Sequence, residues 1–126
     1  MSDGNGSNDF GVGWGTINFF ENKVLRLSEH VASWHRSRDI MFRIELRTYQ
    51  WAPVSNEYTI VLAGGYVTSE ANVMEFRAAF PEAQYIVLGG SWWKYTAEAE
   101  LAASQCGLKI LGLKEFTAAI RTGALP

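Results

Sequence analysis

The chain has 126 residues, of which 48% are hydrophobic and 19% are charged, and its formal net charge is −2. These values are typical of one globular domain, and the slight negative charge argues against a generally basic nucleic-acid-binding protein while allowing a local basic patch. Cys106 is the one cysteine, so no intramolecular disulfide can form. No apolar run reaches the roughly 18 residues that span a bilayer. We therefore expect a soluble, cytoplasmic protein with no membrane partner.

The N-terminal part divides into a tail and a helix. Residues 1–15 are rich in glycine, serine, asparagine and aspartate, which predicts a flexible tail before a single domain over residues 16–126. A helix is predicted over residues 17–33, with Asn18 and Glu21 at capping-box spacing. Its apolar stripe, with steps of three and four, consists of Ile17, Phe20, Val24, Leu27 and Val31.

A long alternating segment follows a predicted turn over residues 35–39. From Ile40 to Trp51 the alternation predicts a strand with one buried face. The other face carries charges and aromatic rings: Met41, Arg43, Glu45, Arg47, Tyr49 and Trp51. After a turn cluster over residues 52–56, a strand over residues 57–66 is expected to pair with the first as an antiparallel hairpin.

Two near-copies of one phrase mark the second half of the chain. Thr59-Ile60-Val61-Leu62-Ala63-Gly64-Gly65 is echoed by Tyr85-Ile86-Val87-Leu88-Gly89-Gly90, and a segment with helical periodicity follows each. A short aliphatic run, paired glycines and a helix are typical of strand–turn–helix units. The repeat therefore predicts an α/β layer with parallel strands.

Capping residues place the remaining elements. Thr68 or Ser69 can cap a helix that runs to Phe80. Thr96 can cap another that ends near Gly107, which suits the left-handed position after a helix. Two strands and a last helix are expected over residues 83–88, 108–113 and 114–122. The side chains expected to face inward from these helices are Val73, Phe76, Phe80, Ala97, Leu101, Ala102, Phe116 and Ile120. The prediction is a single α/β domain: an N-terminal helix, a β-hairpin and then α-β-α-β-α, forming a mixed sheet with helices on both faces.

Five segments of the second half carry a resemblance to a known family. They are Val73-Met74-Glu75-Phe76, Tyr85-Ile86-Val87-Leu88-Gly89, Tyr95-Thr96-Ala97-Glu98-Ala99, Gly107-Leu108-Lys109-Ile110-Leu111 and Glu115-Phe116-Thr117-Ala118-Ala119-Ile120. With Phe20-Glu21 in the first helix, this order resembles the restriction-endonuclease-like fold, in particular its Mrr-type branch. The resemblance covers about 100 residues and implies a setting of phage–host conflict or DNA processing.

The chain departs from this family at the metal site. The family holds a divalent metal with an aspartate on one hairpin strand and Glu/Gln-x-Lys on the next, but here the second strand ends Leu62-Ala63-Gly64-Gly65. The first strand has Glu45-Leu46-Arg47, and arginine cannot accept a proton near neutral pH. We therefore expect a degenerate, non-cleaving domain without catalytic residues, metal or cofactor. The alternative is a Mg²⁺-dependent nuclease that uses Asp39 and Glu45, with Lys94 brought in from a loop.

Two other interpretations stay open. Gly64, Gly65, Thr68, Gly89 and Gly90 stand where strands give way to helices, so they could bind the phosphate of a nucleotide, although the G-x-G-x-x-G fingerprint is absent. The competing explanation is that these glycines allow tight turns and close packing. In addition, residues 94–120 resemble the last third of a BRCT domain, which implies a protein-interaction module.

Two surfaces are candidates for binding. Four arginines are expected near one end of the hairpin: Arg36, Arg38, Arg43 and Arg47. With Tyr49 and Trp51, they could hold a nucleic-acid backbone and stack on bases, or form a solvated face with ion pairs. The second surface is a loop with Trp92, Trp93, Lys94 and Tyr95, which could anchor a partner, stack a base, close a homodimer or complete the core. We expect a module that binds nucleic acid or a protein partner.

Overall fold

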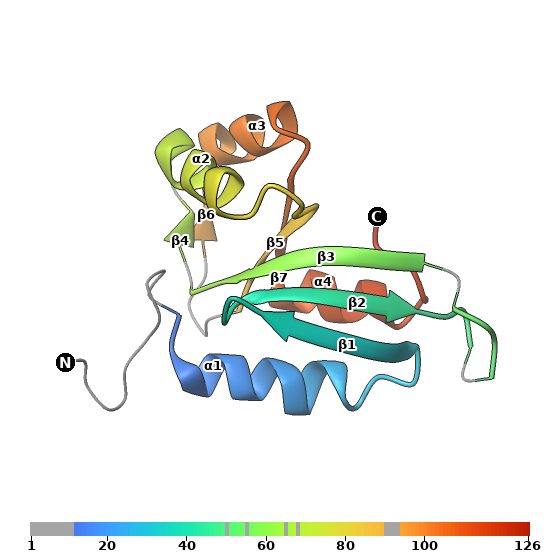
Figure 1. Ribbon diagram of the computed structural model, residues 1–126. Coiled ribbons are helices and arrows are strands. Elements are labelled where there is room, and N and C mark those ends of the chain that lie inside the picture. The colour runs from blue at the N-terminus through green and yellow to red at the C-terminus, as the bar shows by residue number, and fades with distance from the viewer. Residues whose placement is uncertain (1–11, 50, 55, 65, 68, 90–93) are drawn as a thin grey trace.

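The computed structural model describes residues 12–126 apart from 50, 55, 65, 68 and 90–93. This described part forms a mixed sheet of five strands in the order β1-β2-β3-β5-β7 (Figure 1). The strands are β1 (Val31–Ser37), β2 (Met41–Leu46), β3 (Asn56–Ala63), β5 (Tyr85–Leu88) and β7 (Lys109–Gly112). The first three form an antiparallel meander, whereas β3, β5 and β7 run parallel. A small parallel pair, β4 (Tyr66–Val67) with β6 (Lys94–Tyr95), lies outside this sheet.

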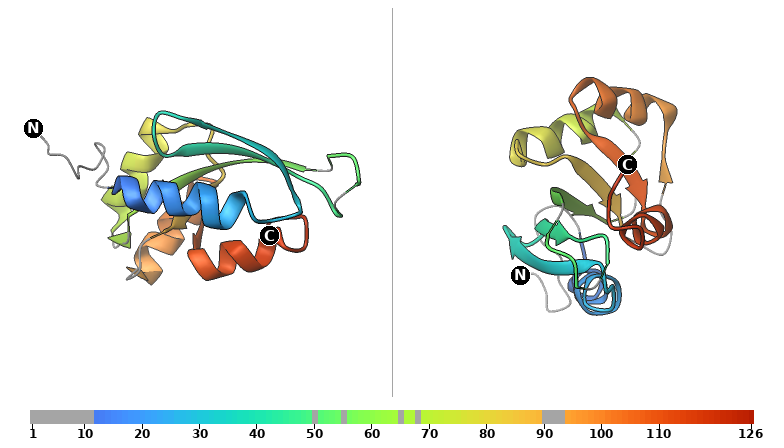
Figure 2. Two further views of the ribbon diagram at one scale, coloured as in Figure 1. Left: turned by 90° about the horizontal axis from the view of Figure 1, so that it is seen from below. Right: turned by 90° about the vertical axis from the view of Figure 1, so that its right-hand side faces the viewer.

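Helices cover both faces of the sheet, which confirms the expected fold class. They are α1 (Trp14–Phe19), which continues as the π-helical η1 (Phe20–Leu25), α2 (Glu70–Ala79), α3 (Ala97–Gln105) and α4 (Leu113–Ile120). The α1–η1 segment and α4 lie on one face, and α2 and α3 lie on the other (Figures 1 and 2). Three phenylalanines join the first layer: the ring of Phe20 lies 5.0 Å from Phe42 of β2 and 5.3 Å from Phe116 of α4.

The predicted N-terminal helix is wrong beyond residue 25. Ile17, Phe20 and Val24 are buried as expected, but the helix ends after Leu25, and Leu27 is 70% exposed. Residues 31–37 form β1, so the predicted hairpin is a three-stranded meander. Helical and extended periodicities overlap in this segment. Pairing of Val31–Ser37 with β2 satisfies a row of backbone hydrogen-bonding groups on β2, which a longer helix would have left without β1 as their partner.

The predicted capping box is also wrong. The helix begins at Trp14, so Asn18 lies inside it, and the cap residue is Gly13. The Glu21 carboxylate instead accepts a hydrogen bond from Trp34 Nε1 at 3.2 Å. Glu21, which the spacing assigned to a local cap, therefore makes a tertiary contact with β1 instead.

In the second half, most sequence predictions are confirmed. Ser69 caps α2 by accepting from the amide of Asn72, and Thr96 caps α3 by accepting from the amide of Ala99. Val73, Phe76, Phe80, Phe116 and Ile120 are buried as expected. On α3 the expectation fails in part, because the buried residues are Ala99, Ala102 and Ala103, whereas Ala97 is exposed and Leu101 is 61% exposed. Small alanines let α3 pack closely, and its larger side chain stays outside.

One region of the sheet has no helix over it within the part of the chain that the structure describes. On β3, Val61 and Ala63 are buried under the α2–α3 layer, but Glu57 on the same face is exposed. The uncovered face continues across β2 and β1, where Arg43 pairs in register with His35 and with Thr59. Among the described residues, no helix is both long and apolar enough to cross a bilayer.

Tyr85 gives the stability of the fold an alkaline pH dependence. Its hydroxyl donates to the carbonyl of Pro126, and burial, with a smaller effect of Tyr58, raises its pKa above the usual value of 10.0. A raised folded-state pKa gives stability that is fully present below the unfolded-state pKa and is lost as the pH rises through the folded-state pKa. We therefore expect the free energy of unfolding to fall above about pH 10.

Urea unfolding between pH 8 and pH 11 checks this expectation with the variant Tyr85→Phe. The variant should be less stable near neutral pH, because it lacks the hydrogen bond, and should lose less stability at high pH. Some alkaline dependence should persist, because burial followed by Glu115 and Glu100 also raises the pKa of Tyr95. Equal alkaline slopes in the two proteins would contradict the prediction.

Candidate functional site

The two carboxylates of the nuclease alternative do not meet. Asp39 lies in the β1–β2 turn, before the start of β2, whereas Glu45 is near the far end of that strand. From Met41 to Glu45 alone the strand spans about 13 Å, since each residue adds roughly 3.3 Å. Metal–oxygen distances are about 2.0–2.6 Å, so one ion cannot bind both side chains. The described residues contain no group of three or more His, Cys, Asp or Glu side chains that could hold a metal.

Each of these carboxylates has a local partner instead. Glu45 accepts a hydrogen bond from Ser33 on the neighbouring strand. Asp39 lies beside Arg36, whose Nη1 is 3.9 Å from Asp39 Oδ1 and whose Nε is 3.4 Å from Glu21 Oε2. The Arg36 guanidinium therefore stands between the carboxylates of Asp39 and Glu21, and Glu45 is not part of this cluster. This arrangement favours a structural ion pair over a catalytic centre.

The four arginines are not gathered at one end of the hairpin. Arg36 and Arg38 lie at the β1–β2 end, Arg43 lies in the middle of β2, and Arg47 follows the opposite end of β2. The Arg38 side chain packs against the end of α2, where its guanidinium carbon lies 4.5 Å from the centre of the Phe80 ring. The expected cluster is wrong because each residue of a strand adds roughly 3.3 Å, so arginines that are several positions apart lie far from one another. Arg43 keeps an exposed position on the uncovered sheet face.

Tyr49 and Trp51 lie on the β2–β3 loop and not on the face of β2, because the strand ends at Leu46. Trp51 is 84% exposed and Tyr49 is 62% exposed, and Val54 in the same loop is 48% exposed. Single exposed apolar side chains are normal on a protein surface, but three on one loop make that loop a candidate for binding.

The loop is held at its base. Ala52 is buried, and its amide donates to the carbonyl of Tyr49 at 3.0 Å. The Arg47 amide donates to the carbonyl of His30, and His30 Nδ1 lies 2.9 Å from the carbonyl oxygen of Arg47, which makes Nδ1 the protonated ring nitrogen. The aromatic rings therefore project from an anchored base, which lowers the entropy that binding would cost. We call Arg47, Tyr49 and Trp51 the loop site.

The structure brings the two glycine phrases together. Gly64 and Gly89 follow the paired parallel strands β3 and β5, and the amide of Gly89 donates to the carbonyl of Ala63 at 2.9 Å. A Cβ on Gly89 would lie 2.6 Å from a methyl carbon of Leu62, so close packing alone accounts for this glycine. Neither phrase opens directly into a helix, because β4 and β6 intervene, and Ser69 and Thr96 already cap the helices. Gly65, Gly90 and Thr68 lie outside the described residues.

The second predicted surface is described only in part. Trp92 and Trp93 lie outside the described residues, and Lys94 is described only as a backbone position of β6. Tyr95 is half-buried, with Glu100 and Glu115 as the charges that act on it after burial itself.

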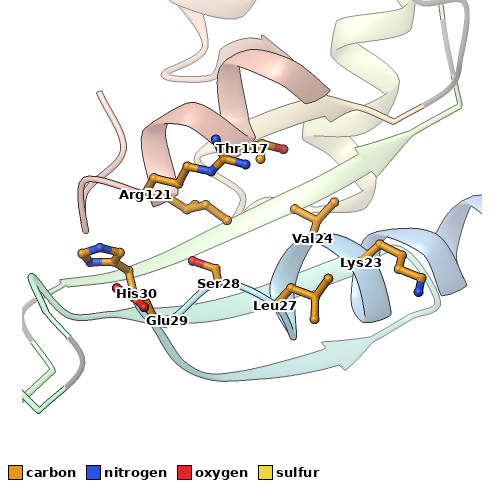
Figure 3. A pocket seen from close by; sticks show the side chains of 9 residues that line it. Lys23, Val24, Leu27, Ser28, Glu29, His30, Thr117 and Arg121 are labelled. Carbon is orange, nitrogen blue, oxygen red and sulfur yellow. The ribbon is translucent and has the colours of Figure 1, made fainter.

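Sequence reasoning missed a groove between η1 and α4, which is lined by Lys23, Lys114 and Arg121 (Figure 3 shows its larger part). One signal was present: Lys114 and Arg121 are seven residues apart, which is two helical turns and therefore one face. The facing helix could not be identified from the sequence, because it lies almost 90 residues earlier.

The described part of this chain is thus an α/β domain, and its candidate site is the exposed loop site. Comparison with known proteins assigns the chain to no family, since no protein-family model, no curated protein and no solved structure matches it.

Proposed function

We propose that this protein is a non-catalytic binding module, related to the Mrr-type restriction-endonuclease-like fold, that binds single-stranded nucleic acid through the loop site. The observation that carries the proposal is the 84% exposure of Trp51, together with exposed Tyr49, on an anchored loop that follows the half-buried Arg47. Aromatic rings stack on bases of any sequence, and arginines contact the phosphates between them. The single Cys106 suits a reducing compartment such as the cytoplasm.

Two features support binding without cleavage. The carboxylates of Asp39 and Glu45 are apart and have partners of their own, so these two side chains cannot share a metal ion that would activate water. The end of β3 presents Leu62, Ala63 and Gly64 where the related nucleases have a carboxylate and a lysine. A domain that binds single-stranded nucleic acid needs neither a metal-binding carboxylate nor a catalytic lysine, because base stacking and phosphate contacts supply the affinity.

The test is fluorescence anisotropy of a labelled 15-nucleotide oligo(dT) with the wild-type protein and Trp51→Ala. Loss of one stacked base costs about 1–3 kcal/mol, so Kd should rise roughly 5- to 150-fold. Trp14→Ala is the matched control: it removes the same ring from the start of α1, at the opposite end of the molecule from the loop (Figure 1), and should leave Kd unchanged.

The other outcomes separate the alternatives. Cleavage of DNA upon addition of Mg²⁺, lost in Glu45→Ala, would show that the domain is a nuclease and would contradict the proposal. Equal Kd values for wild type and Trp51→Ala would exclude the loop site.

A protein partner is the second candidate, and Val54 favours it. An exposed aliphatic side chain beside Trp51 adds little to base stacking but adds contact area in a protein interface. If oligo(dT) and a duplex of the same length both fail to bind at low salt, this candidate replaces the nucleic-acid proposal.

A further inference from the structure

A groove runs along the molecule between the α1–η1 segment and α4. Two adjoining hollows of about 360 and 330 Å³ form it, and both are lined by Lys23, Val24, Thr117 and Arg121. The two helices run in the same direction, so Phe19 faces Leu113 and Lys114 at one end, and His30 faces Arg121 at the other (Figures 2 and 3). From Lys114 to Arg121 the helix rises about 10 Å, which is the length of three stacked bases.

The groove is positively charged on a protein whose net charge is −2. Its lining includes the exposed cations Lys23, Lys114 and Arg121 and the imidazole of His30, and among the described residues that line it Glu29 is the one acidic side chain. Concentration of cations along one groove of an otherwise acidic protein attracts a polyanion and repels a basic partner. Ser28 Oγ adds a polar group: it is buried in the lining and has no hydrogen-bond partner within the part of the chain that the structure describes.

The groove is continuous with the base of the loop site. His30 lines its end and holds the carbonyl of Arg47 at 2.9 Å. Gly123, two residues after Arg121, packs directly against Arg47 and Thr48, as shown by the 2.7 Å that would separate a Cβ on Gly123 from the carbonyl oxygen of Arg47. A strand whose bases stack on the loop site can therefore pass into the groove without crossing a gap.

An aromatic ring also stands at the far end of the groove. Phe19 is 50% exposed beside Lys23 and Lys114, although its neighbour Phe20 is buried in the core. Aromatic rings at both ends with cations between them match the stacking platforms and charged grooves of proteins that bind single strands.

We infer that the η1–α4 groove binds the sugar–phosphate backbone of the same single strand that the loop site engages. The inference rests on the proposed function and adds to it the path of the strand: Trp51 and Tyr49 first, then Arg121 and Lys23, then Lys114 with a base on Phe19. The groove thus supplies the phosphate contacts, and the rings at its two ends supply the stacking.

The salt dependence of binding tests this path. For single strands the slope of log K against log[salt] is about −0.7 for each phosphate contact. The double variant Lys23→Gln/Arg121→Gln should therefore bind oligo(dT) more weakly and reduce the magnitude of the slope by about 1.4. Glu29→Gln should bind more tightly, because it removes the acidic side chain of the groove. Phe19→Ala should weaken binding while leaving the slope unchanged.

Lys109→Gln is the matched control, because it removes an exposed lysine from β7, at the other edge of the sheet from β1. It should leave both Kd and the slope as in the wild type. If the double variant keeps the wild-type slope while Trp51→Ala still weakens binding, the strand leaves the loop site by another route and the inference is wrong, although the proposed function stands. If the wild-type protein does not bind oligo(dT) at low salt, the proposed function itself fails and the inference fails with it. Circular dichroism of each variant confirms that a loss of binding is not a loss of fold.

Discussion

Phe20→Ala is expected to destabilise the protein by about 3–5 kcal/mol, while Phe19→Ala should change the free energy of unfolding by no more than about 0.5 kcal/mol. The two residues are neighbours in one continuous helical segment, so the two substitutions change helix propensity by about the same amount. They differ in burial: Phe20 is 1% exposed, whereas Phe19 is 50% exposed.

The physical reason is the central position of Phe20. Its ring contacts Phe42 of the sheet and Phe116 of α4, with centroid distances of 5.0 and 5.3 Å, so it joins three elements that are far apart in the sequence. Truncation to alanine leaves a cavity among rigid neighbours, which adds to the lost transfer free energy. Urea unfolding followed by circular dichroism measures both variants. Similar losses in the two would show that η1 does not face the sheet through Phe20.

Gly123→Ala should destabilise the protein more than Gly107→Ala does, by about 1–3 kcal/mol. Both glycines have positive φ angles, +87° for Gly123 and +78° for Gly107, so either substitution costs about 1–2 kcal/mol in backbone strain. At Gly107 a Cβ would meet no atom within 4 Å. At Gly123 it would lie 2.7 Å from the Arg47 carbonyl oxygen and 2.9 Å from the Thr48 Cα.

These neighbours of Gly123 are backbone atoms, which cannot move aside as a flexible side chain can. The loop site must therefore shift, or the turn after α4 must open. Chemical unfolding of both variants gives the difference in stability, and equal costs at the two positions would contradict the close approach. Because the Gly123 contact fixes the base of the loop site, Gly123→Ala should also weaken oligo(dT) binding, whereas Gly107→Ala should not.

Where local chemistry decides the structure, the sequence predicted it. The helix caps at Ser69 and Thr96, the left-handed Gly107 and the buried strands of the repeated phrase each depend on residues within a few positions. The alternation from Ile40 to Leu46 likewise placed the buried face of β2 correctly. These features were enough to establish the α/β class and the mixed sheet.

Only the tertiary structure decided the rest. The identity of Val31–Ser37 as a strand depended on pairing with β2, and the partner of Glu21 depended on Trp34 and Arg36 across the layer. The end of β2 at Leu46 moved Tyr49 and Trp51 from a sheet face to a loop, and the packing of α4 beside η1 created the groove. Hydrophobic periodicity shows which side of an element is buried, but it does not show which other element covers it. The sequence by itself therefore determined most elements of this protein but not β1, while the surfaces that could bind a ligand arose from contacts between residues that are distant along the chain.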